Sequence, residues 1–146
     1  MADTVTQPKR SSIMKAVGNK NTKPEMIVRR YLHAQGFRFR IHSKKLSGTP
    51  DIVLAKYKSV IYINGCFWHG HEGCKKATVP KSNTDFWLNK LKRNKERDTV
   101  HANKLIDQGW KVITIWECEL SNKQQLITLE KLKQDLIDEF SKKLFN

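Results

Sequence analysis

The chain has 146 residues, the length of a single domain, and its formal net charge of +14 favours a polyanion such as nucleic acid as its partner. It has no run of about 18 apolar residues, which excludes a membrane-spanning helix, and we expect no signal peptide at its N-terminus. Its three cysteines cannot all pair as disulfides within the chain, so we expect a cytoplasmic protein with reduced thiols.

Residues 1–20 are polar and basic, and this composition fits either an arm that orders on DNA or a plain disordered terminus. Residues 21–146 are expected to form one domain. Within it, Thr22-Lys-Pro-Glu25 predicts a helix that begins with a capping box, and Gly36 predicts where this helix ends. Besides this capping role, the Glu25 carboxylate has a second interpretation, in which it faces a catalytic centre.

Four segments predict β-strands, and their arrangement around helices predicts an α/β fold. Residues 37–41 alternate apolar and basic side chains, residues 51–55 form a short strand, and residues 59–64 and 110–116 are apolar runs typical of central strands. A long helix expected over residues 85–108 would connect the last two strands in parallel. A final helix carries an apolar stripe that we expect to pack in the core: Leu126, Leu129, Leu132, Leu136, Ile137, Phe140 and Leu144.

All three cysteines follow the two predicted central strands. Cys66 and Cys74 lie in the loop after residues 59–64, and Cys118 lies two residues beyond the strand over 110–116. If these strands are parallel neighbours, their ends lie side by side, and three thiolates with one histidine complete a closed, structural zinc site. His69 and His71 are both candidates for the fourth ligand; the alternative is three ordinary buried thiols.

Asp51 is the candidate for catalytic metal binding, because it opens a strand directly after a Gly-Thr-Pro turn. Phosphodiester hydrolysis uses Mg²⁺ held by a few oxygen ligands, and a carboxylate with a backbone carbonyl of the neighbouring strand can supply them. The alternative for Asp51 is an ordinary turn residue. His69 can accept a proton from water at neutral pH, unless it is a surface residue or the zinc ligand.

Three aromatic residues are candidates for contact with bases. Phe67 and Trp68 lie in a polar, glycine-containing loop, where apolar side chains can wedge between base steps or cover the metal site. Trp87 starts the long helix, and its alternative role is to dock this helix on the sheet.

Six motifs, in their order and spacing, resemble the very-short-patch repair (Vsr) endonucleases over about residues 9 to 120. They are Asn21–Glu25, Gly48–Asp51, Asn64–His69, Phe86–Trp87, Asn94–Asp98 and Trp116–Cys118. The resemblance implies a restriction-endonuclease-like three-layer fold, with a central mixed sheet flanked by helices and a structural zinc site. It implies a bacterial enzyme at the nucleoid that nicks one strand of duplex DNA at a T:G mismatch.

The resemblance also implies roles for individual residues. Asp51 and the Ile63 carbonyl would bind catalytic Mg²⁺, His69 would be the general base, and Glu25 would assist at the same centre. Structural Zn²⁺ would be held by Cys66, His71, Cys74 and Cys118. Phe67, Trp68 and Trp87 would intercalate beside the mismatch, while the arm over residues 1–20 clamps the duplex. Asn64 departs from members that carry histidine there, and its amide can bind a phosphate or water instead.

Two other functions fit parts of the sequence. A non-catalytic zinc-containing module that binds distorted DNA explains the charge, the cysteines and the aromatic residues, but it leaves Asp51 and Glu25 without a shared purpose. A restriction-type endonuclease that cuts matched sites would act as a dimer. We expect a monomer that binds mismatched double-stranded DNA. The family resemblance adds mismatch-repair proteins and a DNA cytosine methyltransferase as expected partners.

Overall fold

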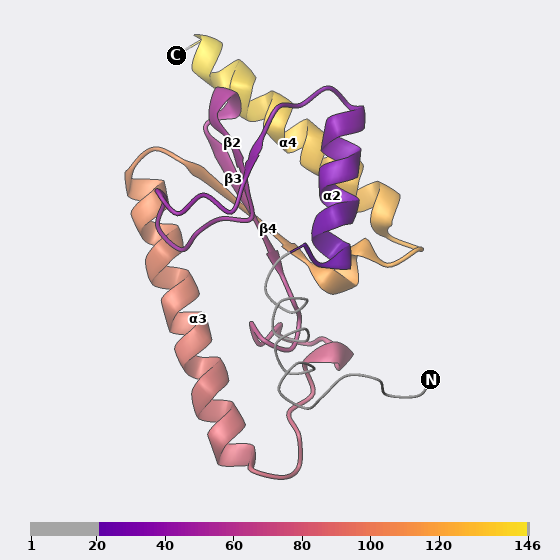
Figure 1. The fold of residues 1–146 in the computed structure, drawn as a ribbon, viewed down its shortest axis with the longest axis vertical. Coiled ribbons are helices and arrows are strands. Elements are labelled where there is room, and N and C mark those ends of the chain that lie inside the picture. The colour runs from indigo at the N-terminus through magenta and orange to yellow at the C-terminus, as the bar shows by residue number, and fades with distance from the viewer. Residues whose placement is uncertain (1–20, 146) are drawn as a thin grey trace, which may run out of the picture.

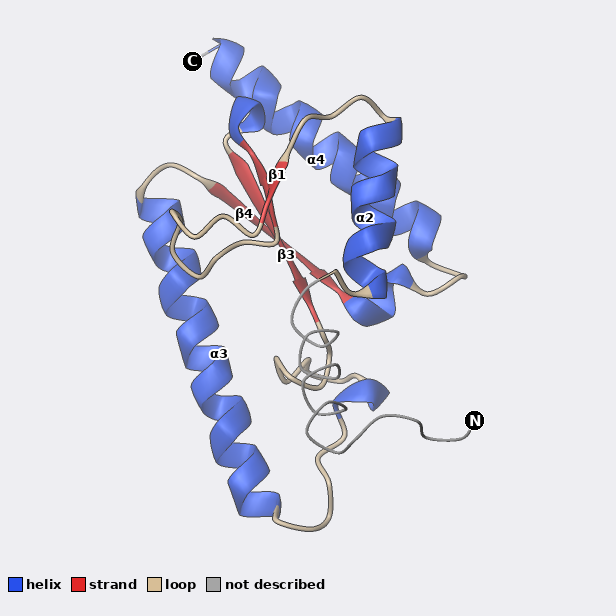
Figure 2. Cartoon of the chain, viewed as in Figure 1, coloured by secondary structure: helices blue, strands red, loops and turns tan. Residues whose placement is uncertain are grey.

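The computed structural model describes residues 21–145, and it confirms the predicted α/β class (Figures 1 and 2). The helices are α2 (Lys23–Ala34), α3 (Thr84–Asp107) and α4 (Gln125–Phe145). The strands are β1 (Arg40–Ile41), β2 (Ile52–Leu54), β3 (Ser59–Asn64) and β4 (Lys111–Trp116). Short 3-10 helices span Ala55–Tyr57, Lys75–Ala77 and Glu117–Leu120. The predicted N-terminal arm lies outside the described residues.

The sheet is mixed, with the strand order β1-β2-β3-β4. β1 with β2 and β2 with β3 are antiparallel pairs, whereas β3 and β4 are parallel and α3 forms the connection between them. The parallel unit predicted from the sequence is therefore confirmed. Only β3 of the two predicted central strands has neighbours on both sides, since β4 is an edge strand in the part of the sheet that the structure describes.

Helices cover both faces of the sheet, because the side chains of β2, β3 and β4 alternate between two cores. One core joins Ile52, Ile61 and Ile115 to α2 and α4. The other joins Val60 and Val112 to Leu105 of α3. Figure 1 shows the same arrangement, with α3 on one side of the strands and α2 and α4 on the other. Each inward strand residue thus contributes about 1.5–3 kcal/mol of apolar burial.

Two sequence predictions differ from the structure. The strand expected over residues 37–41 is reduced to Arg40–Ile41, because β2 offers only a short partner and His42 adopts a left-handed conformation with φ of 47°. The stripe of α4 is buried at Leu129, Leu132 and Leu136. Leu126 and Leu144 are instead 64% and 63% exposed, and Ile137 is also exposed, so the predicted core role is wrong for these three. None of the described helices is both long and apolar enough to span a membrane.

Candidate active site

A cleft of about 1070 Å³ opens where β3 ends, and it brings together most of the residues selected from the sequence. We call it the Asp51 cleft. Its lining includes Glu25, Asp51, Ile63, Asn64, Phe67, Trp68 and His69, together with Asp98 and His101 of α3. Residues far apart in the chain therefore share one cavity, in which acidic and imidazole side chains lie beside exposed aromatic rings.

Asp51 is fixed by the end of the β2–β3 ladder. The Ile63 N–H donates to Asp51 Oδ2 at 2.7 Å, and the His42 N–H donates to the Asp51 backbone carbonyl at 3.1 Å. Burial raises the pKa of Asp51 to about 6; the Ile63 N–H, His42 and His69 lower it, and Glu25 raises it further. A carboxylate held in this way gains stability when a cation binds to it.

Gly48 makes the turn before Asp51 possible. Its φ is +75°, and a Cβ atom at this position would lie 2.6 Å from Tyr62 Oη and 2.7 Å from His101 Cβ. Any side chain at residue 48 would therefore displace the turn from α3 and β3. The Gly-Thr-Pro turn thus brings Asp51 close to the end of β3.

The pKa of Asp51 predicts how the stability of the protein depends on pH. Between pH 3.8 and about 6, the folded chain holds a proton on Asp51 that the unfolded chain releases. Without added divalent cations, the free energy of unfolding therefore decreases as pH rises through this window, by at most about 3 kcal/mol. Asp51→Asn removes this contribution, so the variant should be more stable than the wild type by about 1–3 kcal/mol at pH 7.5. Urea unfolding of both proteins from pH 4 to 8 measures the difference, and equal stability at every pH would contradict the prediction.

His69 is oriented by a carboxylate of α3. Its Nδ1 lies 2.6 Å from Asp98 Oδ2, with both side chains partly exposed. With Nδ1–H donating to the carboxylate, Nε2 keeps its lone pair and can accept a proton. One helical turn earlier, Asn94 Nδ2 donates to the Trp68 carbonyl at 2.8 Å, so α3 holds the His69 loop at two points.

Phe67, Trp68 and Trp87 form one aromatic cluster. Their ring centroids lie 5.1 to 6.0 Å apart in edge-to-face arrangements, and Trp68 is 48% exposed. Lys90 Nζ lies 5.4 Å from the Trp68 centroid and 5.8 Å from that of Trp87. The structure thus brings together the three predicted aromatic residues beside a cation, at the rim of the Asp51 cleft.

Glu25 lies in the first turn of α2, and its carboxylate faces the Asp51 cleft. The side chain of Thr22 caps α2 by accepting from the Glu25 N–H at 3.4 Å, but Glu25 Oε2 accepts from Asn21 N–H and not from that of Thr22. The predicted capping box is therefore only half formed. The Glu25 carboxylate is buried, lines the Asp51 cleft, and contacts Arg29 and His42.

The four predicted zinc ligands converge at the ends of β3 and β4. Asn64 and Trp116 are register partners, so Cys66 and Cys118 follow at equivalent positions. Cys66, His71, Cys74 and Cys118 each offer a ligand atom within 4.8 Å of the others, which fits a tetrahedral cage whose sulfur atoms lie about 3.8 Å apart. His71 joins this cluster and stacks on Trp116 at 4.1 Å, whereas His69 pairs with Asp98.

The thiols of this cluster differ in acidity. Burial raises the pKa of Cys66 to about 12 and also raises that of Cys118. At Cys74, burial also acts upward, but hydrogen bonds from the Lys76 N–H and from the other two cysteines outweigh it and lower the pKa. Thiols grouped in this way become thiolates when a metal ion binds, because the cation stabilises the deprotonated form.

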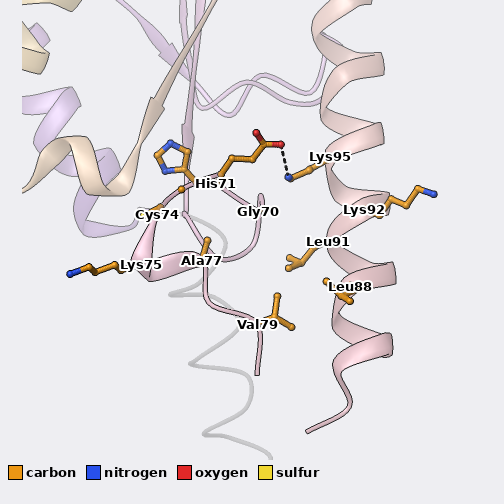
Figure 3. Close-up of a pocket in the computed structure, with 12 residues that line it drawn as sticks. Gly70, His71, Cys74, Lys75, Ala77, Val79, Leu88, Leu91, Lys92 and Lys95 are labelled. Atoms are coloured by element: carbon orange, nitrogen blue, oxygen red, sulfur yellow. Dashed lines mark ion pairs between the residues drawn. The ribbon is translucent and has the colours of Figure 1, made fainter. Parts of the chain in front are cut away.

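The loop over residues 66–74, which carries three of the four cluster residues, also contacts α3. A pocket of about 640 Å³ lies between this loop and α3, where it is lined by Leu88, Leu91, Lys92 and Lys95. Figure 3 shows Leu91 and Lys95 directed from α3 towards the loop. Lys95 Nζ pairs with Glu72 at 3.6 Å, and its chain lies so close to Gly70 that a Cβ there would meet Lys95 Cε at 2.5 Å. A side chain at residue 70 would displace the end of Lys95, and the φ of +60° at Gly70 is itself one that favours glycine.

Three residues that contact the site are not predicted from the sequence. Asp98 belongs to a quoted motif, and its spacing from Asn94 and His101 on one helix face was the available signal. His42 and Arg29 gave no local signal, because their contacts with Glu25 depend on how α2 packs against the β1–β2 connection.

Comparison with known proteins now adds the family. Residues 2–76 match the family model described as DNA mismatch endonuclease Vsr. The chain is 54% identical over 123 residues to the type II nicking enzyme V.NmeAIP of Neisseria meningitidis, which covers 84% of this chain and 87% of the relative. It is 43% identical over 138 residues to the type II nicking enzyme V.XorIIP of Xanthomonas oryzae, which covers 94% and 98%.

A third relative carries the family name itself. The chain is 39% identical over 126 residues to the DNA mismatch endonuclease Vsr of Escherichia coli, which covers 86% of this chain and 80% of the relative. The resemblance inferred from the motifs is therefore confirmed, and the chain belongs to the Vsr family of DNA mismatch endonucleases.

Proposed function

We propose that this protein is a Mg²⁺-dependent endonuclease that nicks one strand of duplex DNA at T:G mismatches in very-short-patch repair. The observation that carries the proposal is that Asp51 and His69 line one cleft whose rim holds the aromatic cluster of Phe67, Trp68 and Trp87, in which Trp68 is exposed. Relatives named as nicking enzymes and as a mismatch endonuclease support the reaction class.

The end of the β2–β3 ladder supports a Mg²⁺ site at Asp51 and Ile63. In a strand, the N–H and C=O of one residue point to the same edge, and the Ile63 N–H points to the Asp51 carboxylate. Continuing the register of Ile52 with Ile61 would place Pro50 opposite Ile63, and proline has no N–H to donate to the Ile63 carbonyl. This carbonyl and the Asp51 carboxylate are hard oxygen ligands, as Mg²⁺ prefers. The bound ion would polarise the scissile phosphate and stabilise its developing charge.

His69 is the proposed general base. Asp98 at Nδ1 holds the imidazole so that Nε2 is the atom that accepts the proton from water. Asn64, at the end of β3 in the same cleft, cannot act as a second base, and its amide is proposed to hydrogen-bond the phosphate or the water. Glu25 is proposed to assist at this centre through its position beside Asp51.

Asp98→Asn tests this orientation. The variant keeps a side chain of the same size but lets residue 98 donate to Nδ1, which favours the tautomer with its proton on Nε2. We expect the single-turnover nicking rate to fall about 100-fold, with unchanged affinity for the duplex. A residue that hydrogen-bonds and orients a reacting group typically changes the rate by about this factor. Asp98→Glu should recover part of the rate. If Asp98→Asn nicks like the wild type, Asp98 does not position the base.

The aromatic cluster is the proposed wedge. Inserting apolar rings between base steps unstacks them, and this costs least where a mismatch has already weakened the stack. Lys90, which lies beside both tryptophans, would then contact a phosphate at the opened step. In this proposal the aromatic cluster at the rim of the cleft selects mismatches, and Asp51 and His69 within the cleft carry out the reaction.

The Cys/His cluster is proposed to hold structural Zn²⁺, because four protein ligands leave no open position for a substrate. We further propose that the fold is of the restriction-endonuclease type. The mixed sheet between helices and the position of Asp51 directly before β2 support this proposal. One chain carries both Asp51 and His69, which suffices to cut one strand, so a monomer is the proposed active form.

A nicking assay tests the proposal. End-labelled duplexes with each mismatch in varied flanking sequence are incubated with the protein and Mg²⁺. Matched duplexes are incubated in the same way, and EDTA is added only to stop each reaction. One-strand cleavage at T:G alone supports the proposed function. Cleavage of matched DNA in both strands would favour a restriction-type enzyme, and binding without cleavage across the panel would favour a DNA-binding module.

A further inference from the structure

The Glu25 carboxylate forms a buried ion pair with Arg29. Arg29 Nη2 lies 2.7 Å from Glu25 Oε2, and its Nη1 donates to Asn21 Oδ1 at 2.8 Å. The two side chains are 11% and 3% exposed, so this ion pair lies in a low-dielectric environment that strengthens it. It therefore differs from the usual solvated pair on a helix surface, which contributes little.

Several donors converge on the same oxygen. His42 Nε2 lies 2.9 Å from Glu25 Oε2, and the Asn21 N–H donates to it at 3.2 Å. Arg29 Nη2 and His42 Nε2 lie only 3.3 Å apart, because both are directed at this one atom. The arrangement gives Glu25 Oε2 the kind of positive surroundings that a bound metal ion would otherwise supply.

Arg29 uses its two terminal nitrogens for these contacts and leaves its third donor unused. Its Nε is buried and has no hydrogen-bond partner among residues 21–145, and leaving such a donor unpaired costs about 1–3 kcal/mol. An arginine that served only to tie α2 to its N-terminal cap would gain from turning to pair this group. The guanidinium is instead held where it faces Glu25 and His42.

These contacts lie next to Asp51. Glu25, His42 and Asp51 each offer one ligand atom within 4.8 Å of the others, a set of two carboxylates and an imidazole that could hold a divalent cation. A divalent ion bound among all three would lie close to the Arg29 guanidinium, and like charges at such separations repel strongly.

We propose that Arg29 takes the place of a second metal ion in this enzyme. It neutralises Glu25 and excludes a cation from the site formed by Glu25, His42 and Asp51, so that the cleft works with a single divalent ion at Asp51. This inference rests on the proposed function only in taking Asp51 as the ligand of that ion.

Removing the positive charge should therefore create a metal site. Arg29→Ala and Arg29→Gln are expected to bind one Mn²⁺ more per chain than the wild type, with an affinity for this ion at least about 100-fold higher than that of the wild-type protein. Mn²⁺ is the probe because it accepts imidazole as well as carboxylate ligands. Arg29→Lys keeps the charge and should bind as many ions as the wild type. Arg29→Ala/Glu25→Gln loses a ligand and should return to the wild-type number.

The experiment counts Mn²⁺ ions bound to the full, zinc-loaded chain by electron paramagnetic resonance, in which Zn²⁺ is silent, with circular dichroism of every variant. One ion in the wild type and two in the neutral variants support the proposal. The proposal is overturned if the wild type and the folded neutral variants bind the same number of Mn²⁺ ions. If that number is zero, the proposed function also loses its metal ion. If it is one, the proposed function is unaffected. If Arg29→Ala does not fold, Arg29→Gln decides. Failure of both to fold, beside a folded Arg29→Lys, would assign Arg29 a purely structural role and overturn the proposal.

Discussion

Asp51→Asn is expected to reduce the single-turnover rate of nicking by at least about 1000-fold at saturating Mg²⁺. The substitution keeps the acceptor for the Ile63 N–H but removes the charge that we propose holds the metal ion beside the scissile phosphate. A metal ion contributes several kcal/mol to such a transition state, and about 4 kcal/mol corresponds to this factor. The rate is measured with excess enzyme on an end-labelled T:G duplex, so that product release does not limit it.

Two controls separate a catalytic role from damage to the fold. Binding of the mismatched duplex by Asp51→Asn should stay within a few-fold of the wild type, and its unfolding transition should move to higher and not lower stability at pH 7.5. Glu117→Gln removes a different carboxylate that lines the same cleft, and it should nick at close to the wild-type rate. Near wild-type nicking by Asp51→Asn would show that the metal ion is held elsewhere.

The part of the site that the sequence predicted is the part that depends on strand ends. Cys66 and Cys118 were expected together because two apolar runs, each followed two residues later by a cysteine, form parallel neighbours with Asn64 opposite Trp116. The role of Asp51 beside the same strand ends came from the family resemblance. Local patterns therefore sufficed where two apolar runs marked the strands and the residues after them marked the strand ends.

The part that it did not predict depends on how helices pack against the sheet. Asp98 reaches His69 across 29 positions in the sequence, and His42 reaches Glu25 across 17. Such contacts depend on the rotation of α3 and α2 about their axes, which apolar patterns fix only to within a helix face. In α4, Leu126 and Leu144 lie at the two ends of the helix and are exposed, although they continue its apolar stripe.

Loss of the zinc ion proposed for the Cys/His cluster is expected to destabilise the protein more than any other single change at the site. Cys118 is the only proposed ligand outside the loop over residues 66–74, so Cys118→Ser should separate this loop from the end of β4. We expect the variant to lose bound zinc and about 3 kcal/mol or more of its free energy of unfolding, which lowers Tm by about 10 °C. Zinc content by elemental analysis and Tm by calorimetry measure the two effects, and a chelator should lower the Tm of the wild type in the same way.

A pair of histidine variants makes this prediction specific to the cluster. His71→Ala should lose zinc and unfold at lower temperature, because the His71 ring lies among the three thiols and stacks on Trp116. His69→Ala should keep both zinc and Tm but lose nicking, because its ring pairs with Asp98 and is directed at the cleft. The opposite result, with zinc lost from His69→Ala and kept by His71→Ala, would exchange the two roles. The two histidines are separated by one glycine. The expected pair of results would show that a single short loop binds the structural metal through His71 and presents His69 as the catalytic base.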